Sequence, residues 1–234
     1  MIHRYAHTFL FVSALVACSS GEPAGGRPPP APPESPTPAA ADVRPMIVFL
    51  GTSLTAGLGL PDASLAYPGL IQSRLDSAGI AYRVVNAGVS GETSAAALRR
   101  VDWLLAQGPV AVLFVETGAN DGLRGQDPDS LRANIDAIFA RARQQVPPPA
   151  LILAGMEAPP NLGQDYTNRF RAVFPEAARA SGARLLPFLL EGVAGVERLN
   201  QADGIHPTVE GQREIANLVW EVLLETVGGA GDRE

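Results

Sequence analysis

The stretch Gly51-Thr52-Ser53-Leu54-Thr55-Ala56-Gly57 follows the apolar run Met46-Ile47-Val48-Phe49-Leu50, which ends abruptly in glycine. The run is too short for a buried helix, so the pattern predicts a buried strand that passes into a tight turn. Ser53 lies in that turn, at the carboxyl end of the strand, where open parallel sheets bind their ligands. A serine displayed there can serve as a nucleophile, although similar turns also occur as simple helix caps. The function therefore depends on the partners that the rest of the chain offers.

Apolar runs and helical stripes alternate along the rest of the chain. Further strands are expected over residues 82–86, 110–117, 151–155 and 184–187. Apolar residues at helical spacing predict helices over 98–105, 131–142 and 170–177, and a last helix after Pro207. Pro175 is expected to kink the third helix or to mark its start. Repeated strand–helix units predict an α/β fold, a three-layer α/β/α sandwich around a flavodoxin-like parallel sheet of about five strands.

The N-terminal residues have the composition of an export signal. Residues 1–18 contain Arg4 and then the apolar run 9–17, which is too short to span a bilayer and is typical of a signal peptide. Leu15-Val16-Ala17-Cys18 resembles the lipobox of bacterial lipoproteins, in which the cysteine is lipidated, and Ser19 favours the outer membrane. The alternative is an ordinary signal peptide with a chance cysteine. We interpret the chain as an outer-membrane lipoprotein facing the periplasm, which meets the membrane only through its N-terminal lipid anchor.

Composition also sets the expected domain boundaries. Residues 19–45 are rich in Pro, Ala, Gly and Ser and cannot bury enough apolar surface to fold, so they are predicted to be a disordered tether. The 234 residues, 46% of them hydrophobic, supply one substantial core, which we place in a single domain over 46–227. Residues 228–234 are expected to form a flexible tail.

Three absences narrow the chemistry. The chain has no lysine, so its 18 basic residues are all arginine, which excludes Schiff-base catalysis and a phosphate-loop lysine. Cys18 is the sole cysteine, so the domain has no thiol nucleophile and no thiolate metal site. His3 and His7 lie at the extreme N-terminus, which leaves His206 as the only imidazole of the domain. We therefore expect no cofactor and no metal, and a net charge of −6 without a basic cluster argues against nucleic acid as a partner.

Each of the first three predicted strands ends in a distinctive turn. The turns are Gly51-Thr52-Ser53, Asn86-Ala87-Gly88-Val89-Ser90-Gly91 and Gly118-Ala119-Asn120-Asp121-Gly122. In a parallel sheet they emerge on the same edge, so they can converge although they are distant in sequence. A fourth segment, Asp203-Gly204-Ile205-His206-Pro207, places a carboxylate close enough to hydrogen-bond one nitrogen of the imidazole. The other nitrogen is then free to take a proton from Ser53, as in a Ser–His–Asp triad.

These four ordered blocks resemble those of the SGNH, or GDSL, hydrolases. The similarity is closest to the bacterial arylesterase, thioesterase I and lysophospholipase L1 branch, and it extends over essentially all of the predicted domain. It includes Glu92-Thr93-Ser94, Asp121-Gly122-Leu123-Arg124-Gly125 and Leu186-Pro187-Phe188.

The resemblance implies a role for each of the residues in these blocks. Ser53 would be the nucleophile, His206 the general base and acid, and Asp203 its orienting partner. The oxyanion hole would consist of the backbone amides of Ser53 and Gly88 and the side-chain amide of Asn120. Glycine at 88 allows a close approach of the backbone, and asparagine at 120 supplies a neutral donor.

The sequence departs from the family at two positions. The family usually has aspartate where this chain has Thr52, and often glycine where it has Ala119. The aspartate lies outside the triad and supports the nucleophile turn; threonine can still hydrogen-bond there, but without a charge. We therefore expect a turn that is less rigid than in the family, and a lower rate of the catalysed reaction.

The expected reaction is hydrolysis of small-molecule acyl esters or thioesters through an acyl-enzyme, with aryl esters and lysophospholipids among the substrates considered. The acyl group is expected along the loops after the third and fourth strands. These loops carry Leu123, Met156, Pro159, Pro160 and Leu162, which are equally compatible with the edge of the core.

Three other functions remain compatible with the sequence. A carbohydrate O-acetylesterase acting on envelope polysaccharide would use the same catalytic residues. A flavodoxin-like binding module would hold a phosphate in the loop 51–57, but it would have no need of Asp203 and His206 together. A catalytically inactive lipoprotein scaffold would be consistent with Thr52.

Overall fold

Five parallel strands form the central sheet of the computed structural model, which describes residues 42–228. They are β1 (Met46–Gly51), β2 (Arg83–Gly88), β3 (Val110–Glu116), β4 (Ala150–Ala154) and β5 (Arg184–Leu186). The order across the sheet is β2-β1-β3-β4-β5, and every neighbouring pair is parallel. The predicted strands are confirmed, with ends that shift by one or two residues. The predicted signal peptide, Cys18, most of the tether and the tail after Gly228 lie outside the described residues.

The apolar runs become strands because both faces of the sheet are covered. All six residues of β1 are buried, and β3 is buried except at Ala111. Continuous apolar sequence is typical of such parallel strands, in contrast to the alternation of half-exposed sheets. The edge strand β2 is only partly buried, which agrees with its more polar sequence.

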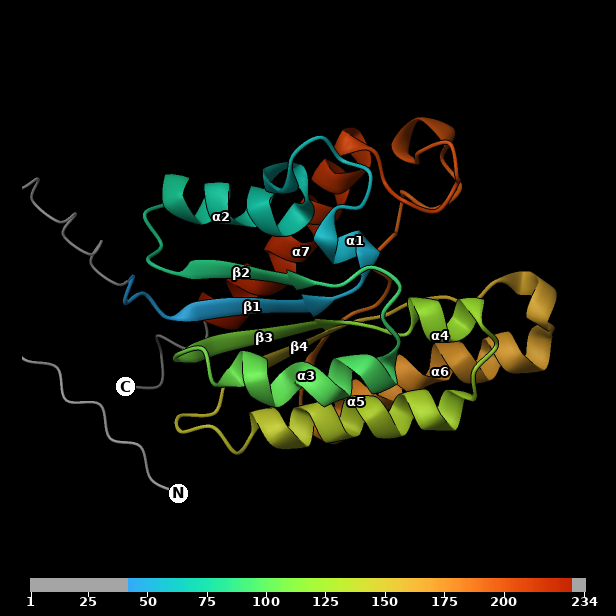
Figure 1. Cartoon of the computed structure of the whole chain (residues 1–234), viewed down its shortest axis with the longest axis horizontal. Helices are drawn as coiled ribbons and strands as arrows, with labels where there is room; N and C mark the ends of the chain where they lie inside the picture. Colours follow the sequence, from blue (N-terminus) through green and yellow to red (C-terminus); the bar gives the residue numbers. More distant parts are fainter. Residues whose placement is uncertain (1–41, 229–234) are drawn as a thin grey trace, which may run out of the picture. The chain divides into compact units, whose positions relative to one another are not determined.

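Helices pack on both faces of the sheet and complete a three-layer sandwich (Figure 1). On one face lie α2 (Tyr67–Ser77) and α7 (Val209–Gly228), in contact with each other. On the other face lie α3 (Ser94–Leu105), α5 (Pro128–Ala142) and α6 (Gln164–Ser181), with α5 between its two neighbours. The predicted fold class is thereby confirmed. None of the helices within residues 42–228 is long and apolar enough to cross a bilayer.

Two helices differ from the sequence-based expectation. Pro175 neither starts nor divides α6, which continues through it, because Phe170, Phe174 and Ala177 on both sides of the proline are buried in the core. Helix α2, whose buried residues include Tyr67 and Ile71, is not among the helices expected from the sequence. Short helices occupy the loops: α1 (Ser53–Ala56), α4 (Ala119–Leu123), and the 3₁₀ turns η1 (Ala63–Leu65), η2 (Pro160–Leu162) and η3 (Glu197–Leu199).

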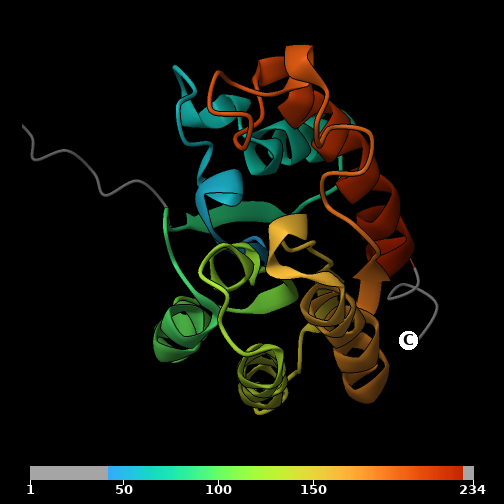
Figure 2. The ribbon, with the colours of Figure 1, turned by 90° about the vertical axis from the view of Figure 1, so that its right-hand side faces the viewer.

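The strand order places a topological switch point between β1 and β3. The chain passes from β1 to β2 on one side and then returns past β1 to add β3, β4 and β5 on the other. In doubly wound sheets, ligands bind in the crevice outside the carboxyl ends of the strands at this point. Figure 2 looks onto that edge, where the short helices α1 and α4 follow β1 and β3. Ser53 begins the first of these helices, and Asn120 lies in the second.

Candidate active site

Ser53, His206 and Asp203 form one hydrogen-bonded row at this edge of the sheet. The Oγ of Ser53 lies 2.9 Å from Nε2 of His206, and Oδ2 of Asp203 lies 2.6 Å from Nδ1 of the same ring. With the proton on Nδ1 donated to the carboxylate, Nε2 is free to accept the hydroxyl hydrogen of Ser53. The structure thus brings together three residues that the sequence places up to 153 positions apart.

Asp203 is held as an anion by the loop that it starts. Its Oδ1 accepts the backbone N–H of Ile205 at 2.9 Å and that of His206 at 3.0 Å. The backbone N–H of His206, then its imidazole, and then the N–H of Ile205 hold the pKa of Asp203 well below its usual range. One carboxylate oxygen therefore fixes the loop while the other orients the ring.

Two residues that the sequence analysis missed anchor this loop. Gln201 donates its backbone N–H to the carbonyl of His206 at 2.7 Å, and its side-chain amide reaches the carbonyls of Leu58 and Pro207 at 2.8 and 3.0 Å. Asn200 is buried and donates to the carbonyl of Val193 at 2.6 Å. The bond to Leu58 ties the histidine loop to the segment that leaves α1, and the bond to Val193 ties it to the loop after β5. The only signal in the sequence is a pair of amide residues just before Asp203.

The predicted oxyanion donors follow three neighbouring strands. Gly51 at the end of β1 is the register partner of Gly88 at the end of β2. A Cβ on Gly88 would lie 2.2 Å from the backbone nitrogen of Ala56, so only glycine lets this turn pack on α1, the helix that Ser53 begins. The N–H of Gly88 donates to Oδ1 of Asn86 at 3.0 Å, which means that an oxyanion must share or displace that acceptor.

Asn120 uses one of its two amide hydrogens in a bond to the backbone. Its Nδ2 donates to the carbonyl of Glu92 at 3.0 Å, which fixes the orientation of the amide and leaves the second hydrogen unused by this bond. The adjacent Ala119 is accommodated because the left-handed backbone that ends β3 belongs to Gly118, with φ of 99°. The departure from the family at 119 therefore introduces no strain.

Arg100 on α3 ties the turns of β1 and β2 together, and the sequence analysis did not foresee this. Its guanidinium donates to the carbonyl of Ala87 at 2.7 Å, to that of Gly51 at 3.3 Å, and to both oxygens of the buried Glu92 at 2.7 and 2.6 Å. The fork geometry of arginine allows one side chain to serve all these acceptors.

An apolar groove of about 350 Å³ opens beside this row. Its lining includes Leu123, Met156 and Pro159, three of the residues proposed from the sequence, together with Phe188 and Ile205. Ala119 and Gly204 also line it, so the groove begins next to Asn120 and next to the histidine loop. Leu162 is not part of the lining; it lies in η2, with its Cδ2 3.8 Å from the position of a Cβ on Gly125.

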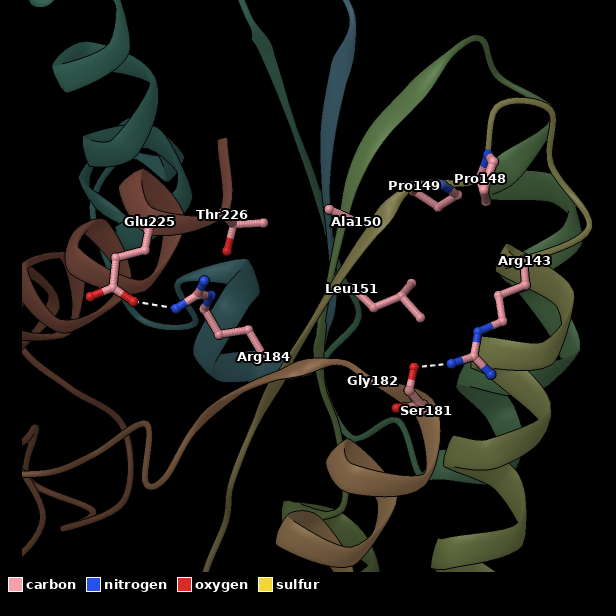
Figure 3. A pocket seen from close by; sticks show the side chains of 10 residues that line it. All are labelled: Arg143, Pro148, Pro149, Ala150, Leu151, Ser181, Gly182, Arg184, Glu225 and Thr226. Atoms are coloured by element: carbon pink, nitrogen blue, oxygen red, sulfur yellow. Dashed lines mark hydrogen bonds and ion pairs between the residues drawn. The ribbon is translucent and has the colours of Figure 1, made fainter. Parts of the chain in front are cut away.

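A second cavity, also of about 350 Å³, lies where β4 and β5 begin (Figure 3). Its two guanidiniums are already engaged, because Arg143 donates to the carbonyl of Ser181 at the end of α6 and Arg184 pairs with Glu225. Cations are stabilising near helix C-termini, where carbonyls lack partners. We therefore assign these arginines a structural role. The reactive groups all lie at the opposite edge of the sheet.

A serine, an imidazole and a carboxylate in one row at the rim of an α/β sandwich define a hydrolase of the serine type. Comparison with known proteins gives the family. Residues 49–214 match the GDSL-like Lipase/Acylhydrolase family. Esterase TesA of Pseudomonas aeruginosa is 41% identical over 177 residues, which cover 76% of this chain and 87% of that protein.

Two further relatives agree with this assignment. Thioesterase 1/protease 1/lysophospholipase L1 of Escherichia coli strain K12 is 36% identical over 189 residues, or 81% of this chain and 86% of that protein. The crystal structure of the psychrotrophic esterase EstA from Pseudoalteromonas sp. matches with a TM-score of 0.73 at 31% identity, covering 78% of this chain and 98% of that one. The chain belongs to the GDSL-like lipase/acylhydrolase family, and it is a serine esterase. The resemblance seen in the sequence is confirmed.

Proposed function

We propose that the domain hydrolyses acyl esters or thioesters through an acyl-enzyme formed on Ser53. The Oγ attacks the substrate carbonyl carbon while Nε2 of His206 takes its proton. The tetrahedral intermediate collapses, the acyl–oxygen or acyl–sulfur bond breaks, and His206 returns the proton to the leaving alcohol or thiol. Water then repeats the sequence and releases the acid. The single observation that carries this proposal is the 2.9 Å contact between Oγ of Ser53 and Nε2 of His206.

Asp203 and the three oxyanion donors complete the proposed machinery. Asp203 stabilises the imidazolium that forms when His206 is protonated. The amides of Ser53 and Gly88 and the second hydrogen of Asn120 bind the oxyanion, and removing one such donor typically costs 10²–10³ in kcat.

The groove makes a chain of several carbons the preferred acyl group. A volume of about 350 Å³ with an apolar lining exceeds what an acetyl group can fill. Leu123 and Ile205 extend this apolar surface to the solvent, with exposed fractions of 51% and 47%. Each buried methylene contributes about 0.8 kcal/mol, so substrates with longer chains gain binding energy there. The groove thus favours an acyl esterase, thioesterase or lysophospholipase over a carbohydrate O-acetylesterase.

A series of p-nitrophenyl esters from acetyl to palmitoyl tests this function. We expect kcat/KM to rise with chain length until the groove is filled, and Ser53→Ala to abolish turnover and labelling by a fluorophosphonate. A maximum at acetyl would favour the O-acetylesterase, and labelling of Ser53→Ala would remove Ser53 as the nucleophile.

We also propose that the protein is exported and anchored to the outer membrane through a lipid on Cys18, with its domain in the periplasm. The support is the lipobox-like sequence 15–18, the absence of any other cysteine, and the Pro-rich stretch that separates it from the domain. Mass spectrometry of the mature N-terminus should find Cys18 as the first residue, carrying a lipid. A mature chain cleaved elsewhere, or one that stays in the soluble fraction, would contradict the anchor.

A further inference from the structure

The carboxyl group of Glu116 lies directly beneath the turn that carries Ser53. Glu116 is the last residue of β3, and it is completely buried. Its Oε2 accepts the backbone N–H of Thr52 at 2.6 Å and the hydroxyl of Thr55 at 2.9 Å, and the hydroxyl of Thr52 lies 3.0 Å from both carboxyl oxygens. The residue before Ser53 and a residue of the helix after it are thus bound to one side chain.

The hydrogen-bond directions fit an ionised carboxylate. The N–H of Thr52 can only donate, and its 2.6 Å distance is short, in the direction expected when the acceptor is charged. The hydroxyl of Tyr67 lies 2.6 Å from that of Thr55, so Tyr67 can donate to Thr55, which in turn donates to Glu116. A protonated carboxyl would need an acceptor of its own, and one of these hydroxyls would have to reverse.

The structure makes room for this network. A Cβ on Gly51 would lie 1.9 Å from Oγ1 of Thr55 and 2.8 Å from Oε2 of Glu116. The glycine that ends β1 is therefore required by the side chains beneath the turn, and not by its own backbone angles, since its φ is not in the left-handed region.

We propose that ionised Glu116 is a positioning residue for the esterase reaction, which fixes the Ser53 turn through Thr52 and Thr55. The proposal rests on the assignment of Ser53 as nucleophile. Glu116 does not touch the substrate; it acts by holding the Gly51–Thr52 peptide and the side chains of Thr52 and Thr55 on either side of Ser53, and so the direction of the Ser53 hydroxyl and amide. Burial raises the pKa of Glu116 to about 7, so its ionisation falls within the range in which esterases can be assayed.

Thr52, at the position where the family usually has aspartate, contributes two neutral donors to this network. An aspartate at 52 would place a second carboxyl within about 3 Å of the first, where Oγ1 of Thr52 now lies. Two carboxyls at that distance share one proton rather than ionise together. Threonine supplies a neutral donor instead, and the negative charge beneath the turn comes from β3. The sequence predicted a turn supported without a charge, and this prediction missed the carboxyl group of Glu116.

Other ionisable groups border the network and must be separated from it in any pH experiment. Those on the neighbouring elements are Tyr67 of α2, Arg100 of α3, and His206 with Asp203 beyond Ser53. Burial raises the pKa of Tyr67 and the histidine loop lowers that of Asp203, so both shifts lead away from neutral pH. His206 must be neutral to accept a proton, which adds one ionisation to that of Glu116.

The test is the pH dependence of kcat/KM with an uncharged p-nitrophenyl ester, for the wild type and Glu116→Gln. For the wild type we expect log(kcat/KM), plotted against pH, to approach a slope of two on its acid side, the acid limb, because neutral His206 and ionised Glu116 are both needed. In Glu116→Gln we expect a slope of one, a kcat roughly 10–100-fold lower at pH 8, and a KM within about twofold, since the groove is untouched.

Variants at Thr52 provide the matched controls. Thr52→Ser keeps both donors and is expected to keep the two-proton limb, whereas Thr52→Asp should move the limb to higher pH. A slope of two in Glu116→Gln, with or without lower stability, would reduce Glu116 to a structural residue and overturn the proposal. So would an unshifted limb in Thr52→Asp. If Ser53→Ala retained activity instead, the nucleophile assignment would fail, which is a distinct outcome.

Discussion

Gly88 and Ala56 pack backbone against backbone, so that a methyl group on Gly88 would lie 2.2 Å from the amide nitrogen of Ala56 and 2.8 Å from the carbonyl oxygen of Thr52. The turn after β2 and the nucleophile helix after β1 are therefore in direct contact. Two of the proposed oxyanion donors, the amides of Ser53 and Gly88, owe their relative position to this contact.

The variant Gly88→Ala should lose activity because it separates these two turns. We expect kcat to fall by about 100-fold or more, the effect of losing one oxyanion donor, and stability to fall by roughly 1–3 kcal/mol through overpacking. Steady-state kinetics and urea unfolding measure the two effects. Gly182→Ala is the control, because its left-handed φ of 60° costs roughly 1–2 kcal/mol in open space far from the site. Equal kcat in both variants would contradict the assignment of Gly88.

Asp203→Asn should retain the loop and lose the reaction. The amide oxygen can still accept the N–H groups of Ile205 and His206, but its NH₂ then faces Nδ1 of His206. The ring must then accept at Nδ1 and carry its proton on Nε2, which cannot take the proton of Ser53. We expect kcat to fall by about 10⁴, as in other triads, with little change in the melting temperature. A loss of less than tenfold would mean that Asp203 is not the orienting group.

Filling the groove should shorten the preferred acyl chain. Ala194 is exposed and lines the groove, so a phenylalanine there can occupy the acyl site without disturbing the core. We expect Ala194→Phe to lower kcat/KM for decanoyl esters by about fourfold for each methylene displaced, with acetyl and butyryl esters unaffected. Ala140→Phe, on the exposed side of α5, is the matched control. A uniform loss across all chain lengths would place the acyl group elsewhere.

The parts of the fold that the sequence predicts are those with an unbroken or strictly periodic apolar pattern. The apolar runs of β1 and β3 are buried on both faces of the sheet. Runs that are this short and this apolar are typical of central parallel strands. Pro175 was the ambiguous case, and burial of Phe170 and Phe174 settles it in favour of one continuous helix. Local sequence carries no measure of that burial.

In the site, too, residues in short sequence motifs could be predicted, whereas residues that only the fold brings together could not. Ser53, Asp203 and His206 stand in short motifs, so the roles proposed for them could be predicted from those motifs and their resemblance to the family. The partners that hold them do not: Glu116 ends an apolar strand, and Arg100 lies on a helix that is far from Ser53 in sequence. A buried charged residue within an apolar run was the available signal for Glu116. Its acceptor role, however, depends on Thr52 and Thr55 from another strand–helix unit.

Glu116 should make the protein less stable as the pH rises through neutrality. Its pKa is about 7 in the folded protein, against an ordinary value of 4.5. Between these two values the folded chain keeps a proton that the unfolded chain has lost, so the free energy of unfolding decreases with increasing pH and levels off above pH 7. The full change is roughly 3 kcal/mol, taken as an order of magnitude. Shifted groups such as Asp203 and Tyr67 act outside this window, below 3.8 and above 10.

Urea unfolding at pH 5 and pH 8 isolates this contribution in Glu116→Gln. We expect the variant to lack the decrease that Glu116 causes, so that its free energy of unfolding relative to the wild type is higher at pH 8 than at pH 5, while its turnover is slower. That combination has a physical reason, because an ionised carboxylate buried among neutral donors costs stability and is retained only where it positions a reacting group. Parallel pH profiles for the two proteins would show that Glu116 is ionised in both the folded and the unfolded state throughout this range.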